Sequence, residues 1–401
     1  MKRHRIESIE INQKKNKDNY LEKGFYILGQ NQIDMDYITT KTKLNRHMLI
    51  LGKKHHSVFH SLIDQNIHNN ENYIYMGLNQ TREKFEDINN VKLHTLKNLK
   101  SKILDFNTNI NNNNQEKGYT NSIDMFETFT MNEIEDIIYF YNLKNEEDYY
   151  QILYKRILNI ICVILSNIQI REKIGFEKLF EAFNLNVLLV NLIPSEDNIS
   201  NMPNKKLIEK NNMENYEKYW IPKDYNYNNV KLSYIIEDYI NYLKLSEDVN
   251  IEEKIQKGEL ETIKDLFEID FNYSIQQFEN FKEIIIKHKN IFMNIEEPIK
   301  KIKNLDAQIY CFIDSKKISI PESNLISNIL LNLSKKTLSH KLINNNMGFI
   351  YMNGIEVLQY SDNNKYMLMT LLAQSRAYNI SCILSSENLN DYDEYINRIL
   401  A

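Results

Sequence analysis

A glycine between a short apolar run and an amphipathic segment is the first feature of this chain that suggests chemistry. The run 48–51 ends at Gly52. This order is typical of a phosphate-binding loop, G-x-x-x-x-G-K-[ST], whose backbone N–H groups and lysine neutralise phosphates and whose hydroxyl holds Mg²⁺. At the positions of the second glycine, the lysine and the hydroxyl residue, the chain has Ser57, Val58 and Phe59. The sequence therefore predicts the outline of such a loop without its working side chains.

The substituted positions remove the contacts that a bound nucleotide needs. Val58 cannot neutralise the β- and γ-phosphates, and Phe59 cannot ligate Mg²⁺. We therefore expect no cofactor. Weak binding of ATP and Mg²⁺ is an alternative, because the start of a helix attracts anions and Lys53 and Lys54 add positive charge there. A plain strand–turn–helix without a ligand is also consistent with this segment alone.

A later apolar run ends where an ATPase would place its acidic residues. In such enzymes a strand ends in Asp-Glu, where the aspartate assists Mg²⁺ and the glutamate activates the attacking water. Here the run 348–352 is followed by Asn353 and Gly354, neither of which can act as a base. Glu356 is close in sequence but out of register. The side chains that an ATPase needs are thus replaced both in the loop and at the end of the later strand. These two replacements together predict a chain without catalytic residues.

Three histidines lie beside the same loop. His56 and His60 are four residues apart on one face of the expected helix, next to His55. Such a pair can ligate a metal ion. Because no carboxylate or thiol stands at ligand spacing, we expect no metal site.

Strand-like runs alternate with helical patterns at both ends of the chain. The expected strands are 25–28, 48–51, 73–76, 309–313, 348–352 and 380–384, and the expected helices are 57–68, 81–88, 322–339 and 362–377. Such alternation is typical of an α/β fold with a parallel, doubly wound sheet. We therefore expect one sheet assembled from both ends of the chain.

The middle of the chain has a different pattern. Apolar residues repeat at helical spacing from about 130 to 290, with further helices expected at 175–192, 231–245, 251–269 and 274–288. The segment 194–230 contains three of the five prolines and is expected to be irregular. The expected domains are a flexible basic arm (1–23), the first half of an α/β domain (24–129), an all-helical insertion (130–290) and the second half of the α/β domain (291–401).

Composition limits the class of protein further. With 401 residues, 42% of them hydrophobic, the chain is long enough for two or three domains. Its net charge of −5 gives no overall attraction for nucleic acid, so such binding would need a local basic patch. The three cysteines lie far apart in apolar runs, which is typical of reduced thiols. No apolar run approaches the roughly 18 residues of a membrane span, and we expect a cytoplasmic protein.

The chain resembles the type IV secretion coupling ATPases of conjugation, which are TraG/TraD-like, RecA-like P-loop motors. Segment 46–52 (RHMLILG) is similar to the family's R-H-x-L-x-x-G approach to the phosphate loop, and 73–79 lies where the family has a strand ending in Asp-Pro-Lys. Segment 121–124 resembles its N-P-x-D, and 348–389 resembles its Asp-Glu strand with the following A-x-x-R and terminal Gln. The resemblance covers about residues 24–400. It implies a RecA-like P-loop NTPase sheet with a large all-α insertion.

The resemblance also implies that the family's functional positions are replaced. The degenerate positions are Val58, Phe59, Asn353, Gly354 and Glu387, and the vestigial nucleotide site comprises Gly52, Lys53, Lys54 and Ser57. Glu387 occupies the terminal Gln position, where a carboxylate would repel phosphate. Arg376 is retained and would be a candidate arginine finger for a neighbouring subunit in a ring. A helix-surface arginine in a structural ion pair is the alternative.

For function, the resemblance implies a catalytically degenerate, coupling-protein-like subunit or adaptor of a conjugative or type IV secretion-like system for DNA or protein transfer. Its partners would be proteins of that machine, bound through the helical insertion, and copies of itself or of an active homologue in a ring. It would meet the inner face of the membrane only through partners. Another core strand is expected where the chain ends, which implies a truncated chain or a sheet that a partner completes. Two alternatives stay open: an active divergent ATPase that uses Lys53 or Lys54, and an interaction protein unrelated to secretion.

Overall fold

The chain forms two compact units. The computed structural model describes residues 9–10, 25–30, 36–40, 47–51, 55–68, 72–89, 91, 93, 101–107, 120–123, 125–142, 148–172, 184–192, 205–227, 230–246, 279, 281–292, 308–314, 316–341, 348–378 and 380–386. The first unit joins Met1–Ile123 to Ile299–Ala401, and the second is Asp124–Pro298. The first unit is therefore built from the two ends of the chain and the second from its middle.

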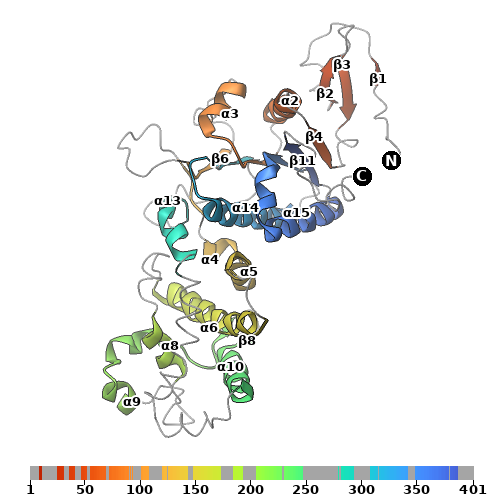
Figure 1. Ribbon diagram of the computed structural model, residues 1–401. Coiled ribbons are helices and arrows are strands. Elements are labelled where there is room, and N and C mark those ends of the chain that lie inside the picture. The colour runs from red at the N-terminus through yellow and green to blue at the C-terminus, as the bar shows by residue number, and fades with distance from the viewer. Residues whose placement is uncertain are drawn as a thin grey trace. The chain divides into compact units, whose positions relative to one another are not determined.

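Six parallel strands form the main sheet of the first unit (Figure 1). They are β4 (Met48–Leu51), β5 (Tyr73–Gly77), β6 (Ser101–Asp105), β9 (Gln308–Phe312), β10 (Gly348–Asn353) and β11 (Ile380–Ser386). Their order is β4-β11-β10-β5-β9-β6, and every neighbouring pair is parallel. β4 pairs with β11 from Met48 opposite Ile383 to Leu51 opposite Ser386. The prediction of a parallel α/β sheet assembled from both ends of the chain is confirmed.

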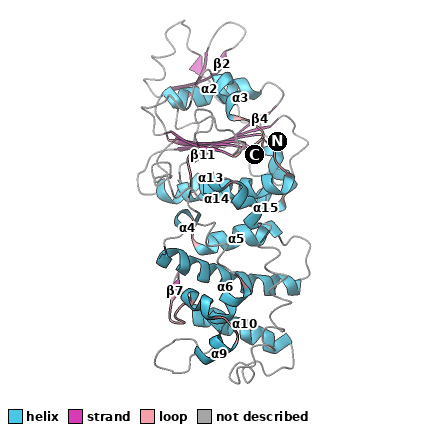
Figure 2. Ribbon diagram, turned by 90° about the vertical axis from the view of Figure 1, so that its left-hand side faces the viewer, coloured by secondary structure: helices cyan, strands magenta, loops and turns pink. Residues whose placement is uncertain are grey.

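Helices cover both faces of this sheet (Figure 2). α2 (His55–His68) and α3 (Arg82–Asn89) lie on one face, and α14 (Ile320–Lys341) and α15 (Asp362–Ser375) lie on the other. The four helices agree with the expected ranges within two residues. Because both faces are covered, β5, β9, β10 and β11 are buried along their whole lengths.

Hydroxyl side chains fix where α14 and α15 begin. The Ser319 hydroxyl accepts a hydrogen bond from the N–H of Glu322 at 3.4 Å, and the Ser361 hydroxyl accepts one from the N–H of Asn364 at 3.3 Å. Each bond satisfies an N–H group that the first turn of a helix leaves without a partner. These caps set the points at which the chain turns back from the carboxyl edge of the sheet.

The face under α2 and α3 is packed with aromatic rings. The core cluster there includes Phe59, Tyr73, Tyr75, Phe85, Tyr310, Phe312, Phe349 and Tyr351. The rings of Tyr75 and Phe85 lie 4.6 Å apart between centroids, and Phe59 meets Tyr351 edge to face at 5.5 Å. Side chains alternate across a strand, so every second residue of β5, β9 and β10 reaches this layer. Burial of each such side chain contributes about 1.5–3 kcal/mol.

Some strands of the first unit differ from the prediction. The strand expected at 25–28 is β2 (Phe25–Gln30), which pairs antiparallel with β3 (Asp36–Thr40), and β3 pairs with β1 (Ile9–Glu10). Placing that strand in the parallel sheet was wrong, because a connection this short permits only antiparallel pairing. β1 also lies inside the expected flexible arm. β6 was not expected, since its only apolar residues are the adjacent Ile103 and Leu104.

The second unit is helical over most of its described residues. Its elements are α4 (Met125–Thr128), α5 (Met131–Asn142), α6 (Asp148–Glu172), α8 (Leu185–Leu192), α9 (Lys205–Lys210), the 3₁₀ helix η2 (Glu214–Tyr219), β7 (Asn226–Tyr227), β8 (Val230–Lys231), α10 (Leu232–Ser246) and α13 (Lys289–Phe292). The antiparallel pair β7–β8 departs from the expected all-helical insertion. None of the helices described in either unit is long and apolar enough to cross a membrane.

The segment 194–230 contains more regular structure than predicted, because α9, η2 and β7 lie within it. The buried Asn191 of α8 holds part of this segment: its Oδ1 accepts from the N–H of Ile221 at 2.8 Å, and its Nδ2 donates to the carbonyl of Tyr219 at 3.3 Å. The helix expected at 251–269 lies outside the described residues. Of the helix expected at 274–288, residues 281–287 are described and helical.

Candidate functional site at the carboxyl edge of the sheet

The residues singled out on β10 lie at the edge of the sheet where open α/β folds bind ligands, outside the carboxyl ends of the strands. β10 runs between β5 and β11, so the ends of these three strands are neighbours. Asn353 ends β10, Ser385 and Ser386 end β11, and Gln80 follows the turn after β5. The candidate site thus takes residues from both ends of the chain.

Asn353 is the centre of a buried network of uncharged side chains. Its Nδ2 donates to Oε1 of Gln80 at 2.9 Å and to the Tyr75 hydroxyl at 3.4 Å, and its Oδ1 accepts from the Ser385 hydroxyl at 2.7 Å. The Tyr75 hydroxyl also donates to Oε1 of Gln80. All four residues are buried. Because buried polar groups need partners, the Asn353 amide is committed to holding the strand ends together.

Backbone contacts join the same strand ends. The N–H of Leu78 donates to the Asn353 carbonyl at 2.9 Å, and the N–H of Gly354 donates to the Ser385 carbonyl at 3.1 Å. Gly354 has φ of 80°, in the left-handed region that strains other side chains. A Cβ at this position would also lie 3.1 Å from Cβ of Asn79. The turn from β10 into the 3₁₀ helix η3 (Ile355–Tyr360) therefore excludes a glutamate at this position.

The network is electrically neutral. Burial raises the pKa of Tyr75 well above its ordinary value, against the smaller lowering by its hydrogen bond with Asn353, so its hydroxyl stays protonated. The amides and the serine hydroxyl have no charge at neutral pH. Mg²⁺ prefers carboxylate oxygens, and a general base must accept a proton near neutral pH. The described residues of this network do not fit Mg²⁺ or water activation.

One carboxylate does reach the candidate site. Oε2 of Glu356, in η3, accepts a hydrogen bond from the Ser386 hydroxyl at 3.1 Å. Its Oε1 would lie 3.4 Å from a Cβ placed on Gly354. Along the chain Glu356 is out of register with the expected acidic pair, but the 3₁₀ helix η3 brings it back to the end of β11.

Phe59, at the expected Mg²⁺-hydroxyl position, is a core residue. It is 0% exposed, and its ring lies 6.2 Å from that of Tyr75 and 5.5 Å from that of Tyr351 between centroids. A serine or threonine here would forfeit this packing.

The remaining predicted residues are described only in part. Ser57 and Val58 lie in the first turn of α2, but their side chains are outside the described part of the structure. Gly52, Lys53, Lys54 and Glu387 lie outside the described residues altogether. Arg376 begins the 3₁₀ helix η4 (Arg376–Tyr378), directly after α15, and only its backbone is described. The arginine-finger interpretation therefore stays a prediction.

His47 holds the strand that leads into the loop. Its Nδ1 accepts from the N–H of Cys382 at 3.2 Å, and its Nε2 lies 2.7 Å from the carbonyl of Leu372. A backbone N–H can only donate, so the proton of the neutral ring is on Nε2, which donates to Leu372. One side chain thus ties the start of β4 to both β11 and α15.

Of the three histidines considered as metal ligands, the structure describes the side chain of His60 alone. This residue is buried, and its Nδ1 lies 3.1 Å from Oδ1 and 2.9 Å from Nδ2 of Asn89. Its ring also meets those of Phe59 and Phe85. Among the side chains that the structure describes, no group of three or more histidine, cysteine or acidic residues is arranged to hold a metal ion.

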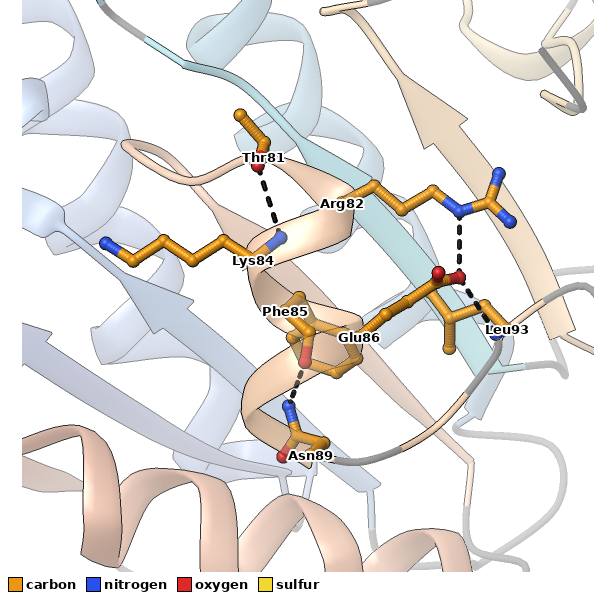
Figure 3. A network of polar contacts seen from close by, with 7 residues as sticks. All are labelled: Thr81, Arg82, Lys84, Phe85, Glu86, Asn89 and Leu93. Atoms are coloured by element: carbon orange, nitrogen blue, oxygen red, sulfur yellow. Dashed lines mark hydrogen bonds and ion pairs between the residues drawn. The ribbon is translucent and has the colours of Figure 1, made fainter. Parts of the chain in front are cut away.

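A second polar cluster stabilises α3 (Figure 3). Nε of Arg82 donates to Oε1 of Glu86 at 3.0 Å, and the same oxygen accepts from the N–H of Leu93 at 3.0 Å. The Thr81 hydroxyl caps the helix by accepting from the N–H of Lys84 at 3.3 Å. Both members of the ion pair are buried, so each charge compensates the desolvation of the other. The arrangement is structural.

Asp105 ends β6 at the same edge of the sheet. Burial raises its pKa to about 6, opposed by hydrogen bonding from Asn107, whose N–H donates to Oδ1 at 3.0 Å. The charge of Glu83 raises the pKa further, and that of Arg82 lowers it. Asp105 belongs to none of the motifs recognised in the sequence.

Sequence reasoning also missed Tyr75, Gln80 and Ser385. A tyrosine in an alternating strand is typical of core packing. Gln80 belongs to no motif, and the segment 348–389 contains Ser385 without giving it a role. Only the pairing of β5, β10 and β11 brings them to Asn353.

Comparison with known proteins gives no family for the chain. No protein-family model matches its sequence, and no curated protein matches it.

Proposed function

We propose that this chain is a non-hydrolysing, coupling-protein-like subunit or adaptor of a conjugative or type IV secretion-like transfer system. The observation that carries the proposal is Asn353, whose amide is bonded to Gln80, Tyr75 and Ser385 where an ATPase would have a Mg²⁺-assisting carboxylate. Gly354 supports it, since its left-handed backbone excludes the neighbouring glutamate. The sheet order adds support, because the strand before Gly52 and the strand before Asn353 end at one edge with β11 between them.

In this proposal the second unit binds partner proteins of the machine. It has its own core, and α10 presents Tyr234, which is 60% exposed. Exposed tyrosines are frequent in protein interfaces because they bury much area with few rotatable bonds. Copies of this chain, or an active homologue, would complete a ring to which Arg376 contributes.

Calorimetric titration with Mg-ATP, followed by a phosphate-release assay on the same sample, tests the loss of hydrolysis. We expect no turnover above a buffer blank, and at most weak binding. Variants Lys53→Ala and Lys54→Ala are measured beside the wild type, because both lysines lie within the loop sequence after Gly52. Turnover that either variant abolishes would refute the proposal and support an active divergent ATPase.

The position of Glu356 favours the second candidate function, an active divergent ATPase, because its carboxylate lies beside the end of β11. If the chain hydrolyses ATP, Glu356→Gln should reduce kcat at least 100-fold, the order of effect expected for loss of a general base. Asp362→Asn, which removes a more exposed carboxylate on α15, should leave kcat unchanged. Equal rates in all three proteins would exclude Glu356 as the base.

The partner-binding part of the proposal has its own test. Purified full-length chain is used to capture proteins from a cell that carries a conjugation-type system, beside a Tyr234→Ser variant. Recovery of secretion-machine components by the wild type, reduced several-fold in the variant, supports the proposal. Equal recovery in both proteins would remove Tyr234 from the interface.

A further inference from the structure

A carboxyl group is buried inside the helical second unit. Glu135 of α5 is 6% exposed, and its neighbours Ile134, Ile137 and Ile138 are buried with it. α5 packs along α6 in this unit (Figures 1 and 2). Burial of an ionised carboxylate is costly unless a cation pairs with it. None of the described residues forms an ion pair with Glu135.

The partner of Glu135 is a neutral amide on α6. The side-chain amide of Asn159 lies against both carboxyl oxygens of Glu135, and with its NH₂ group turned toward α5 it donates to Oε1 at 3.1 Å. In the opposite orientation its carbonyl oxygen would accept a proton from a carboxylic acid. An amide can therefore serve both the ionised and the protonated carboxyl group. Burial between the two helices favours the protonated form, because it removes the carboxyl group from water.

We infer that Glu135 is a proton-binding joint between α5 and α6, and that the packing of these helices loosens when the proton is released above neutral pH. Burial raises the pKa of Glu135 to about 7; the charge of Lys155 on α6 lowers it, and that of Asp136 on α5 raises it. Cys162, also on α6, stays a neutral thiol because burial raises its pKa. Among the side chains described on the two helices, these are the charged and titratable groups that interact electrostatically with Glu135.

The sign of the pH effect follows from the two states of the carboxyl group. An unfolded glutamate titrates near its ordinary value of 4.5, whereas the folded one titrates near 7. Between these values the folded unit binds a proton that the unfolded chain has released, so folding is favoured more strongly at the lower pH. The stabilisation is fully present below about 4.5 and is lost as the pH rises through about 7.

Hydrogen–deuterium exchange of the full-length chain tests the inference. Protection of peptides from α5 and α6 is measured from pH 5.5 to 8.5, corrected for the intrinsic pH dependence of exchange. We expect wild-type protection to fall by roughly 30-fold over this range, since each pKa unit corresponds to tenfold and about 1.5 units separate pH 5.5 from the folded pKa of about 7. In Glu135→Gln, the protection of α5 and α6 should stay high and should not change with pH. A wild type without the fall, or a Glu135→Gln protein that keeps it, would overturn the inference.

Two charge variants keep the test decisive if Glu135→Gln does not fold. Lys155 and Asp136 are both exposed and act on Glu135 with opposite signs. Lys155→Gln should therefore move the midpoint of the fall to higher pH, and Asp136→Asn should move it to lower pH. Midpoints that stay at the wild-type value in both variants would show that the buried carboxyl does not control this interface.

Discussion

Single residues at the carboxyl edge have structural partners where an ATPase would need reactive groups. Asn353 uses both ends of its amide, and Phe59 is enclosed by the aromatic layer. The consequence is that these positions cannot be restored one at a time. A carboxylate introduced at Asn353 would face the Gln80 carbonyl oxygen in a dry environment, without a cation to offset its charge.

We expect Asn353→Asp to destabilise the first unit by roughly 2–4 kcal/mol at pH 8, the range for an uncompensated buried charge or lost network donor. The loss should shrink toward pH 4, because a buried aspartate can then take up a proton. Urea unfolding at both pH values measures it. Asn215→Asp makes the same change at an exposed position and should cost less than about 0.5 kcal/mol. Equal stabilities of the wild type and Asn353→Asp would show that the network adapts to a carboxylate.

A second prediction for a single residue concerns Asp105. Its folded pKa of about 6 lies above the ordinary value of 3.8, so its ionisation costs stability as the pH rises through that window. Asp105→Asn keeps an acceptor for the Asn107 N–H and should stabilise the protein by roughly 1–3 kcal/mol at pH 8. The gain should vanish near pH 4. A gain that is independent of pH would point to a cause other than titration.

At the scale of elements, β4 can form only when the two ends of the chain come together, because it pairs with β11. Its four residues pair with β11, more than 300 positions later in the chain, and His47 adds side-chain bonds to β11 and α15. Its residues Met48 to Ile50 are only partly buried, unlike those of β5 and β10. The strand that leads to Gly52 stands at one end of the described strand order, and His47 adds two side-chain hydrogen bonds to it.

Replacing His47 by alanine leaves the N–H of Cys382 and the carbonyl of Leu372 without these partners. We expect a loss of roughly 1–3 kcal/mol, the range for unmade buried hydrogen bonds. Hydrogen exchange should accelerate first in β4, because β11 also pairs with β10. Gln374→Ala, near the end of α15, is the matched control, because Gln374 is also partly buried. Uniform acceleration across the whole sheet would argue against a local role for His47.

In the whole molecule, each of the two units has its own buried residues, and the only tryptophan, Trp220, belongs to the second unit. Its fluorescence therefore reports on that unit alone. Phe59, by contrast, is at the centre of the aromatic layer in the first unit.

We expect Phe59→Ala to lower the free energy of unfolding of the first unit by about 3–5 kcal/mol, through lost burial and the cavity left behind. Urea unfolding followed by far-UV circular dichroism should show the earlier transition. The Trp220 fluorescence transition should stay within experimental error of the wild type. A parallel shift of both signals would mean that the two units unfold as one cooperative block.

Much of the α/β sheet could be predicted from local pattern. The runs at 48–51, 73–76, 348–352 and 380–384 are short and apolar, and the structure places strands on all of them. The antiparallel pairing of β2 escaped prediction, because a strand's partner is set by the length of its connection and not by its own residues. Glu356 was undervalued for a similar reason: spacing along the chain gave no sign of the 3₁₀ turn after Gly354.

By itself, the sequence determined the class of fold, the two regions of the chain that supply the sheet, and the uncharged residues at the end of β10. Those properties depend on side-chain type and on periodicity, which are local. Only the tertiary structure decided that the Asn353 amide forms hydrogen bonds with Gln80, Tyr75 and Ser385. It also decided that Glu135 of α5 faces an amide on α6. Such partners lie up to 278 residues apart, and hydrogen bonding and desolvation depend on distance in space, which chain order does not encode.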